Sequence, residues 1–240
     1  MSSDITKAIV VTGASQGIGL AAAHALSSGG WRVIGIARTA PPDFPGEFIA
    51  ADLTNAEVVA ATARQLAARG DLRGIVNNFG LARHDLIDTV APADVLALIS
   101  GNLHPALALT QALLPGFRAA RFGRIVNVTS LVTRGYAFRA GYAAAKAALE
   151  SLTRTIAIET AADGITANAV APGPTETTLF RANNKPGSEG EARYLAQVPM
   201  RRVAKPGEIA AAIAFFASDA AAFTTGQTLF IDGGASLGRL

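Results

Sequence analysis

The feature that most constrains the fold is an alternation of short, β-branched apolar runs with longer segments rich in Ala and Leu. Strands that are apolar on both faces and alternate with helices are typical of a parallel sheet covered on both sides. The sequence therefore predicts an α/β fold: a single-domain (1–240), Rossmann-like, doubly wound parallel sheet of about seven strands with helices on both faces. We expect strands at 8–11, 33–36, 48–50, 74–77, 124–128, 165–170 and 228–231, and helices at 17–28, 55–69, 92–120 and 140–162.

Composition excludes several functional classes. Half of the 240 residues are hydrophobic and 16% are charged, which suits a chain with a large buried core and not a disordered one. The formal net charge is +3, but the basic residues are dispersed, so no nucleic-acid partner is expected. The chain has no Cys, and its three His lack metal-ligand spacing, so neither a disulfide nor a bound metal is expected.

Two further segments bear on location and on the pocket. The first residues lack the basic and apolar regions of a signal peptide, so we expect a cytoplasmic protein. Segment 95–117 carries no formal charge, but polar residues and a proline interrupt it, so we expect a helix buried in protein and no membrane partner. Segment 178–199 is polar and rich in turn formers, which indicates a mobile lid over a pocket or, alternatively, a simple surface insertion.

A glycine-rich turn follows the first expected strand and opens the first helix. Its G-x-x-x-G-x-G spacing lets the backbone approach a pyrophosphate, which free N–H groups and the helix dipole stabilise. The same letters fit the nucleophile elbow of serine hydrolases, but too few residues precede Ser15 and no His follows His104 to act as a late base. The residues expected to contact a dinucleotide here are Gly13, Ser15, Gln16, Gly17, Ile18 and Gly19.

The end of the second expected strand indicates which dinucleotide is bound. A free ribose 2′-hydroxyl is usually held by Asp or Glu at this place, but the chain has Arg38 and Thr39 there. A guanidinium pairs with a 2′-phosphate through charge-assisted hydrogen bonds. We therefore predict NADP(H) over NAD(H) by roughly 10- to 100-fold. The alternative is that Arg38 faces solvent while Asp43 holds the hydroxyl.

Tyr142 and Lys146 open a predicted helix, and their spacing of four puts the phenol and the ammonium on one face. A tyrosine needs its pKa lowered from about 10 to about 7 for efficient proton transfer at neutral pH, which takes roughly 4 kcal/mol that a nearby ammonium can help supply. Ser130 ends a strand twelve residues earlier, where its hydroxyl could polarise a carbonyl group.

With these residues the chain resembles the short-chain dehydrogenase/reductase family over nearly its whole length. The matching motifs, in chain order, are Thr12-Gly13-x-x-x-Gly17-Ile18-Gly19, Asp52-Leu53, Asn77-Asn78-Phe79-Gly80, Asn102, Ser130, Tyr142-x-x-x-Lys146, Pro172-Gly173 and Gly226-Gln227-x-x-x-x-Asp232-Gly233-Gly234. The resemblance implies hydride transfer between a nicotinamide and a carbonyl or alcohol carbon.

The resemblance also implies roles for individual residues. Tyr142 would be the general acid and Ser130 the partner of the carbonyl oxygen. Lys146 would hold the nicotinamide ribose and lower the tyrosine pKa, while Asn102 would position a water that restores the proton. Expected cofactor contacts are Asp52 and Leu53 at the adenine, Asn78 and Gly80 near its ribose, Thr177 at the carboxamide or diphosphate, and Tyr142, Lys146, Pro172, Gly173 and Thr175.

The chain departs from the family pattern at two places. Phe79 replaces a small residue, which is expected to reshape the pocket floor. Pro105 cannot donate to the carbonyl of Gly101, which predicts a helix kink beside Asn102. The freed carbonyl could hold a water, or the kink could serve packing alone.

The pocket walls are expected from 81–90, 131–139 and the lid, beyond the carboxyl ends of the strands. Arg134 and Arg139 favour an anionic keto compound or an acyl thioester, as in the 3-oxoacyl-carrier-protein reductases that the chain resembles, or else they serve a subunit contact. The Ala-rich faces of helices 94–120 and 140–162 predict a homodimer or homotetramer. An NADPH-dependent carbonyl reductase is the leading hypothesis; an NAD-dependent alcohol or polyol dehydrogenase and a non-catalytic dinucleotide sensor are the alternatives.

Overall fold

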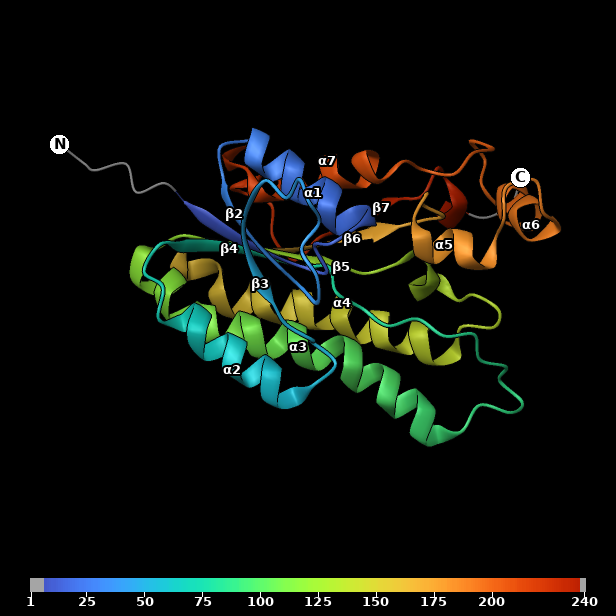
Figure 1. Cartoon of the computed structure of the whole chain (residues 1–240), viewed down its shortest axis with the longest axis horizontal. Coiled ribbons are helices and arrows are strands. Elements are labelled where there is room, and N and C mark those ends of the chain that lie inside the picture. Colours follow the sequence, from blue (N-terminus) through green and yellow to red (C-terminus); the bar gives the residue numbers. More distant parts are fainter. Residues whose placement is uncertain (1–6, 238–240) are drawn as a thin grey trace.

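A seven-stranded parallel sheet with strand order β3-β2-β1-β4-β5-β6-β7 forms the centre of the molecule (Figure 1). The computed structural model describes residues 7–237. Each predicted strand lies within an observed one, so the predicted α/β class and the parallel sheet are confirmed. The strands are β1 (Ala8–Thr12), β2 (Arg32–Ala37), β3 (Gly46–Ala50), β4 (Leu72–Asn77), β5 (Gly123–Val128), β6 (Ile165–Pro172) and β7 (Thr228–Ile231).

Helices cover both faces of the sheet (Figure 1). Helices α1 (Gly17–Ser28) and α7 (Pro206–Ala217) lie on one face, and α2 (Ala56–Ala67), α3 (Pro92–Ala120) and α4 (Ala140–Thr160) lie on the other. The expected helices 55–69 and 140–162 are each slightly too long. Helix α4 stops at Thr160 because the chain tightens there into a 3₁₀ turn that ends at Gly164, whose φ is +76°.

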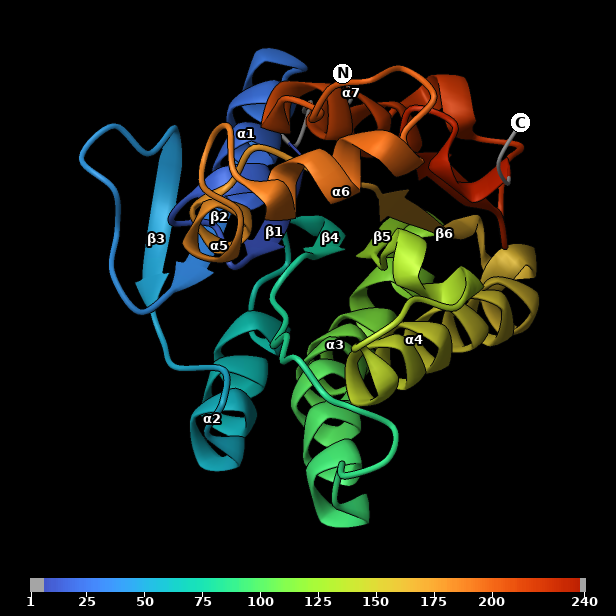
Figure 2. The same cartoon turned by 90° about the vertical axis from the view of Figure 1, so that its right-hand side faces the viewer.

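Three helices were not predicted. Segment 178–199 contains α5 (Thr178–Asn183) and α6 (Glu189–Gln197), each opened by a capping hydroxyl, from Thr177 and Ser188. Figure 2 shows both helices in front of the carboxyl-terminal edge of the sheet. Helix α7 begins with Pro206, and Glu208 accepts a hydrogen bond from the N-cap backbone, two start signals that could have revealed it.

The core has two layers because alternate residues of each buried strand point to opposite faces. On β1, Ala8 and Val10 pack in the cluster that includes residues of α2, α3 and α4. Ile9 and Val11 pack in the second cluster, with residues of α1 and α7. This division explains why the strands read as continuous apolar runs in the sequence.

A buried polar network ties the sheet to the helices below it. Asn77 and Asn127 lie opposite each other on β4 and β5, and Asn77 Nδ2 donates to Asn127 Oδ1 over 2.8 Å. Asn77 Nδ2 also donates to Thr110 Oγ1 of α3. Asn127 Nδ2 donates to Thr153 Oγ1 of α4 over 2.8 Å. The network therefore fixes α4 against the ends of two central strands.

Apolar side chains remain exposed on the helices proposed to mediate assembly. Leu96 on α3 and Ile158 on α4 are 65% and 81% exposed. A homodimer or homotetramer through helices 94–120 and 140–162 stays a prediction. No helix within residues 7–237 combines the length and hydropathy needed to cross a membrane.

We predict that Asn127→Ala lowers the free energy of unfolding by about 2–3 kcal/mol, because it breaks two buried hydrogen bonds and leaves a small cavity. Urea unfolding followed by circular dichroism measures this change. Thr166→Val is the matched control, since the Thr166 hydroxyl is buried without a hydrogen-bond partner and its loss should be neutral or stabilising. Equal stability of wild type and Asn127→Ala would contradict the role given to the network.

Candidate active site

A cavity of about 1010 Å³ lies at the carboxyl-terminal edge of the sheet, where segments that follow the six strands β1 to β6 meet. Such an edge is the usual ligand site of an open α/β sheet. The expected cofactor residues that line it are Gly13, Ser15, Gln16, Gly17, Ile18, Arg38, Thr39, Asp52, Leu53, Asn78, Gly80, Tyr142, Lys146, Pro172, Gly173, Thr175 and Thr177. Of the residues expected to contact the cofactor, Gly19 lies outside this lining.

The glycine turn after β1 is held by the loop after β4. Thr12 Oγ1 accepts hydrogen bonds from the backbone N–H groups of Asn78 and Phe79, both over 3.0 Å. Asn78 Nδ2 donates to the carbonyl oxygens of Thr12 and Gly13. The amide group of Asn78 therefore holds the glycine turn in shape, and Asn78 also lines the cavity.

The glycines leave room that a side chain would fill. A Cβ on Gly19 would lie 2.2 Å from the Gly13 carbonyl oxygen, so Gly19 allows the turn to pack on α1. Gly13 and Gly17 have φ values of +65° and +56°, which other residues rarely adopt. No side chain caps the N-terminus of α1, and its first turn holds no acidic residue. This backbone fits a pyrophosphate.

Arg38 lies at the exposed mouth of the cavity, beside Thr39 and opposite Asp52. Within residues 7–237, no carboxylate oxygen lies within 4.0 Å of its guanidinium. Asp52 accepts from the Thr54 backbone and hydroxyl, which lowers the pKa of Asp52, and the charge of Arg38 lowers that pKa further. Asp43, the alternative partner of a ribose hydroxyl, is not in the cavity lining. An unpaired guanidinium here fits a 2′-phosphate.

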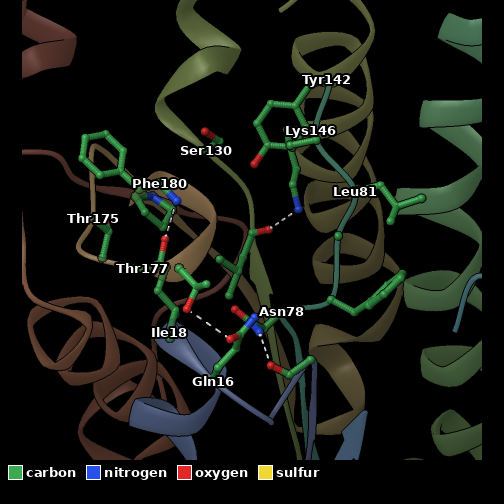
Figure 3. A pocket seen from close by; sticks show the side chains of 18 of the residues that line it. Gln16, Ile18, Asn78, Leu81, Ser130, Tyr142, Lys146, Thr175, Thr177 and Phe180 are labelled. Carbon is green, nitrogen blue, oxygen red and sulfur yellow. Dashed lines mark hydrogen bonds between the residues drawn. The ribbon is translucent and has the colours of Figure 1, made fainter. Parts of the chain in front are cut away.

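The structure brings Ser130 and Tyr142 together in the cavity (Figure 3). Ser130 follows β5 and Tyr142 lies in the first turn of α4, so two elements place the hydroxyl groups side by side. Burial raises the pKa of Tyr142. A hydrogen bond with Ser130 and the positive charge of Arg139 lower this pKa, but by less than burial raises it. The pKa of Tyr142 therefore lies above its ordinary value, not below it.

Lys146 lies one turn further along α4, and its side chain is 3% exposed. Its Nζ donates to the Val128 carbonyl over 2.9 Å (Figure 3) and stands 5.9 Å from the centre of the Tyr142 ring. Burial lowers the pKa of Lys146 to about 8. The ammonium is directed at a backbone carbonyl, and the expectation that Lys146 lowers the pKa of Tyr142 stays a prediction.

Asn102 does not reach the cavity. Its side chain is 1% exposed; Nδ2 donates to the carbonyls of Leu81 and Leu98, and Oδ1 accepts from Leu81 N–H. Asn102 thus fixes the loop that follows β4, and the water predicted beside it stays a prediction. Helix α3 runs unbroken past Pro105, and the predicted kink likewise stays a prediction.

The substrate end of the cavity has the three walls that the sequence indicated: residues 81–84, residues of the loop before α4, and α5 with α6. Phe79 lines the floor while packing against the core beneath. Arg139 lines the cavity, but Arg134 lies outside it, 4.7 Å over the ring of Phe230. The two arginines therefore have different surroundings.

Three aromatic residues at this end were missed in the sequence. Tyr136 stacks on Tyr194 with ring centres 5.7 Å apart, and Phe180 meets Tyr194 edge-on at 5.4 Å. They join the loop before α4 to α5 and α6 across the cavity. The sequence indicated these three residues only in that they lie within segments expected to form the cavity walls. Their spacing in the sequence does not predict that their rings meet.

The strand order and the glycine-rich turn after β1 are those of a Rossmann-like α/β protein that binds a dinucleotide. The model of the family described as enoyl-(acyl carrier protein) reductase matches residues 13–236. The chain belongs to the short-chain dehydrogenase/reductase family, and that prediction is confirmed.

Individual relatives agree over almost the full length. The chain is 40% identical to the 3-oxoacyl-[acyl-carrier-protein] reductase FabG of Vibrio cholerae, over 95% of this chain and 96% of that protein. Among solved structures, a candidate NAD(P)-dependent gluconate 5-dehydrogenase from Beutenbergia cavernae, with NADP bound at low occupancy, is 34% identical. It has a TM-score of 0.89 and covers 97% of each chain. A short-chain dehydrogenase/reductase family protein is 35% identical with a TM-score of 0.88, covering 97% of this chain and 98% of its own.

We predict that Lys146→Met stabilises the cofactor-free protein by about 2 kcal/mol at pH 7. The folded lysine has a pKa of about 8 against an ordinary 10.5, so below pH 8 the folded state carries the full cost of the buried charge. As the pH rises from 8 to 10 the unfolded chain holds more protons, so the stability of the wild type rises.

Urea unfolding at pH 7 and at pH 9.5 checks this prediction. The gap between variant and wild type should shrink at the higher pH, whereas Lys185→Met, at an exposed position, should leave stability unchanged at both. A Lys146→Met protein less stable than wild type at pH 7 would show that the buried ammonium stabilises the fold.

Proposed function

We propose that the chain is an NADPH-dependent reductase of a ketone group, with Tyr142 as the general acid. The observation that carries this proposal is the pairing of the Ser130 and Tyr142 hydroxyls at one end of a cavity whose other end holds the glycine turn and Arg38. The kinship with proteins named 3-oxoacyl-[acyl-carrier-protein] reductase supports it and makes a 3-oxoacyl thioester one candidate substrate.

The cofactor would lie in the part of the cavity that runs from Arg38 past the glycine turn to Lys146. The glycine turn would hold the diphosphate on the free N–H groups of α1, Asp52 and Leu53 would flank the adenine, and Arg38 would pair with the 2′-phosphate. Lys146 would hold the nicotinamide ribose, and the turn from Pro172 to Thr177 would close over the nicotinamide end. When bound, NADPH supplies the hydride.

Ser130 and Tyr142 act on the oxygen of the carbonyl group. Both hydroxyls donate hydrogen bonds to this oxygen, which stabilises the negative charge that develops there. The phenolic proton of Tyr142 is then transferred to that oxygen to give the alcohol. Burial raises the pKa of Tyr142, so the phenol holds its proton at neutral pH, as a general acid must before the transfer, but the raised pKa also makes it a weaker acid. The hydrogen bond with Ser130 and the charge of Arg139 lower this pKa and so favour the transfer.

The reverse reaction, oxidation of a secondary hydroxyl group, is a second candidate, because a structural relative is named as a candidate gluconate 5-dehydrogenase. The same residues serve both directions by microscopic reversibility. In that direction Tyr142 accepts the proton, so its raised pKa predicts that oxidation needs a higher pH than reduction.

We predict that Tyr142→Phe lowers kcat for ketone reduction at least 100-fold, since the variant lacks the proton donor. NADPH oxidation at 340 nm over a panel of diketones, quinones, 3-oxoacyl thioesters and keto acids measures this loss, and fluorescence titration gives the Kd for NADPH. That Kd should stay within threefold of wild type. Full-rate turnover by the variant would refute the mechanism, and NADPH binding without turnover of any compound by wild type would favour a dinucleotide sensor.

The second test concerns the cofactor. We predict that wild type has a kcat/KM for NADPH about 10- to 100-fold above that for NADH, and that Arg38→Asp reverses this preference by repelling a 2′-phosphate and accepting from a 2′-hydroxyl. Arg73→Asp, at a residue outside the cavity lining, is the control. Equal use of both cofactors by wild type would rule out the proposed role of Arg38.

A further inference from the structure

The cations that line the cavity differ in how they are balanced. Arg38 and Lys146 belong to the part proposed for the cofactor. At the substrate end, Arg83 is neutralised: its Nε lies 2.8 Å from Asp85 Oδ1 and its Nη2 lies 3.0 Å from Asp94 Oδ2. No carboxylate oxygen of residues 7–237 lies within 4.0 Å of Arg139. Arg83 thus shares two carboxylates, whereas the guanidinium of Arg139 has no carboxylate partner of its own among these residues.

The guanidinium of Arg139 is held in place. Its Nη1 donates to the Arg83 carbonyl and its Nη2 donates to the Tyr194 hydroxyl, both over 3.3 Å. The backbone of Arg139 bridges that of Asp85, and the Phe138 carbonyl accepts from Asp85 N–H over 3.1 Å. Both partners of the guanidinium are neutral oxygens, so its charge is fixed but not cancelled. A guanidinium has five N–H donors, and several of them remain for a ligand.

Arg139 is also close to the reacting groups. It lies directly before α4 and three residues before Tyr142, and both side chains line the same cavity. Its positive charge lowers the pKa of Tyr142 and that of His84, which agrees with a short separation. A ligand group on Arg139 would thus lie near the carbonyl that Tyr142 protonates.

The ligand chemistry follows from charge and shape. The guanidinium of Arg139 has no carboxylate partner in the described part of the chain, and its planar fork matches the two oxygens of a carboxylate. The Tyr194 hydroxyl accepts from Arg139, so its own proton remains for a ligand. Tyr136 stacks on Tyr194, and burial and Tyr194 raise the pKa of Tyr136 to about 12, so Tyr136 adds no negative charge at this place.

We propose that Arg139, with Tyr194, forms a subsite for a carboxylate carried by the substrate itself. This inference rests on the proposed function and narrows it: the substrate is a keto acid, or the matching hydroxy acid, and not a neutral ketone or a thioester. Because the contact is made equally in the ground state and in the transition state, its loss raises KM more than it lowers kcat.

The test compares 2-, 3-, 4- and 5-oxo acids with their methyl esters, and 3-oxobutanoate with its N-acetylcysteamine thioester, using NADPH. Wild type should prefer at least one acid over its ester more than tenfold in kcat/KM. Arg139→Gln, which removes the charge and shortens the side chain but keeps a polar amide, should reduce this acid-to-ester ratio at least tenfold, mainly through KM. Arg134→Gln should keep the wild-type ratio, since Arg134 lies outside the cavity.

A binding measurement tests the carboxylate subsite without requiring that the compound be reduced. Titration calorimetry of the same acids and esters, with the protein saturated with NADP⁺, should give a Kd for the preferred acid that Arg139→Gln weakens at least tenfold and Arg134→Gln leaves unchanged. The proposed subsite would be overturned if wild type used acid and ester equally well or preferred the thioester. It would also be overturned if Arg139→Gln left both the acid-to-ester ratio and the Kd unchanged. Reduction of neutral diketones without preference for any acid refutes the subsite alone, whereas no reduction of any compound refutes the proposed function.

Discussion

The parallel pairing of β1, β4 and β5 is the constraint on which the site depends. Parallel strands end at the same edge of a sheet, so the glycine turn after β1, the loop after β4 and Ser130 after β5 meet there. The Thr12 hydroxyl then locks the first two of these segments together by accepting two backbone N–H groups. The Asn77–Asn127 pair anchors α4, and through it Tyr142, to the same strand ends.

Two charged side chains in or beside the site, Lys146 and Asp85, are buried with few hydrogen-bond partners. Lys146 is buried with only a carbonyl as its hydrogen-bond partner, and Asp85, beside the start of α4, has one buried oxygen without a partner. Charges buried without full compensation destabilise a protein unless a ligand uses them. Arg139 at the substrate end has no carboxylate partner either, whereas Arg181, which lies outside the main cavity, is paired with Glu176 and Glu191.

Local pattern was enough for much of the fold but not for the ends of two helices or for the three helices α5, α6 and α7. The β-branched runs predicted every strand because a strand buried on both faces needs continuous apolar residues. Helices α5 and α6 were read as a loop, because their polar sequence shows caps but no long apolar face. The sequence did not reveal that the Asn102 side chain bonds to the backbone of Leu81, because the two residues are distant in sequence.

By itself the sequence determined the α/β class, the glycine turn, the spacing of Tyr142 from Lys146, and Arg38 at the end of the second strand. These are properties of neighbouring residues, which backbone geometry and side-chain chemistry decide locally. Only the tertiary structure decided that Lys146 faces the Val128 carbonyl, that the pKa of Tyr142 is raised, and that Arg139 and not Arg134 enters the cavity. Burial and charge pairing depend on groups that long chain separations bring together, so no local pattern encodes them.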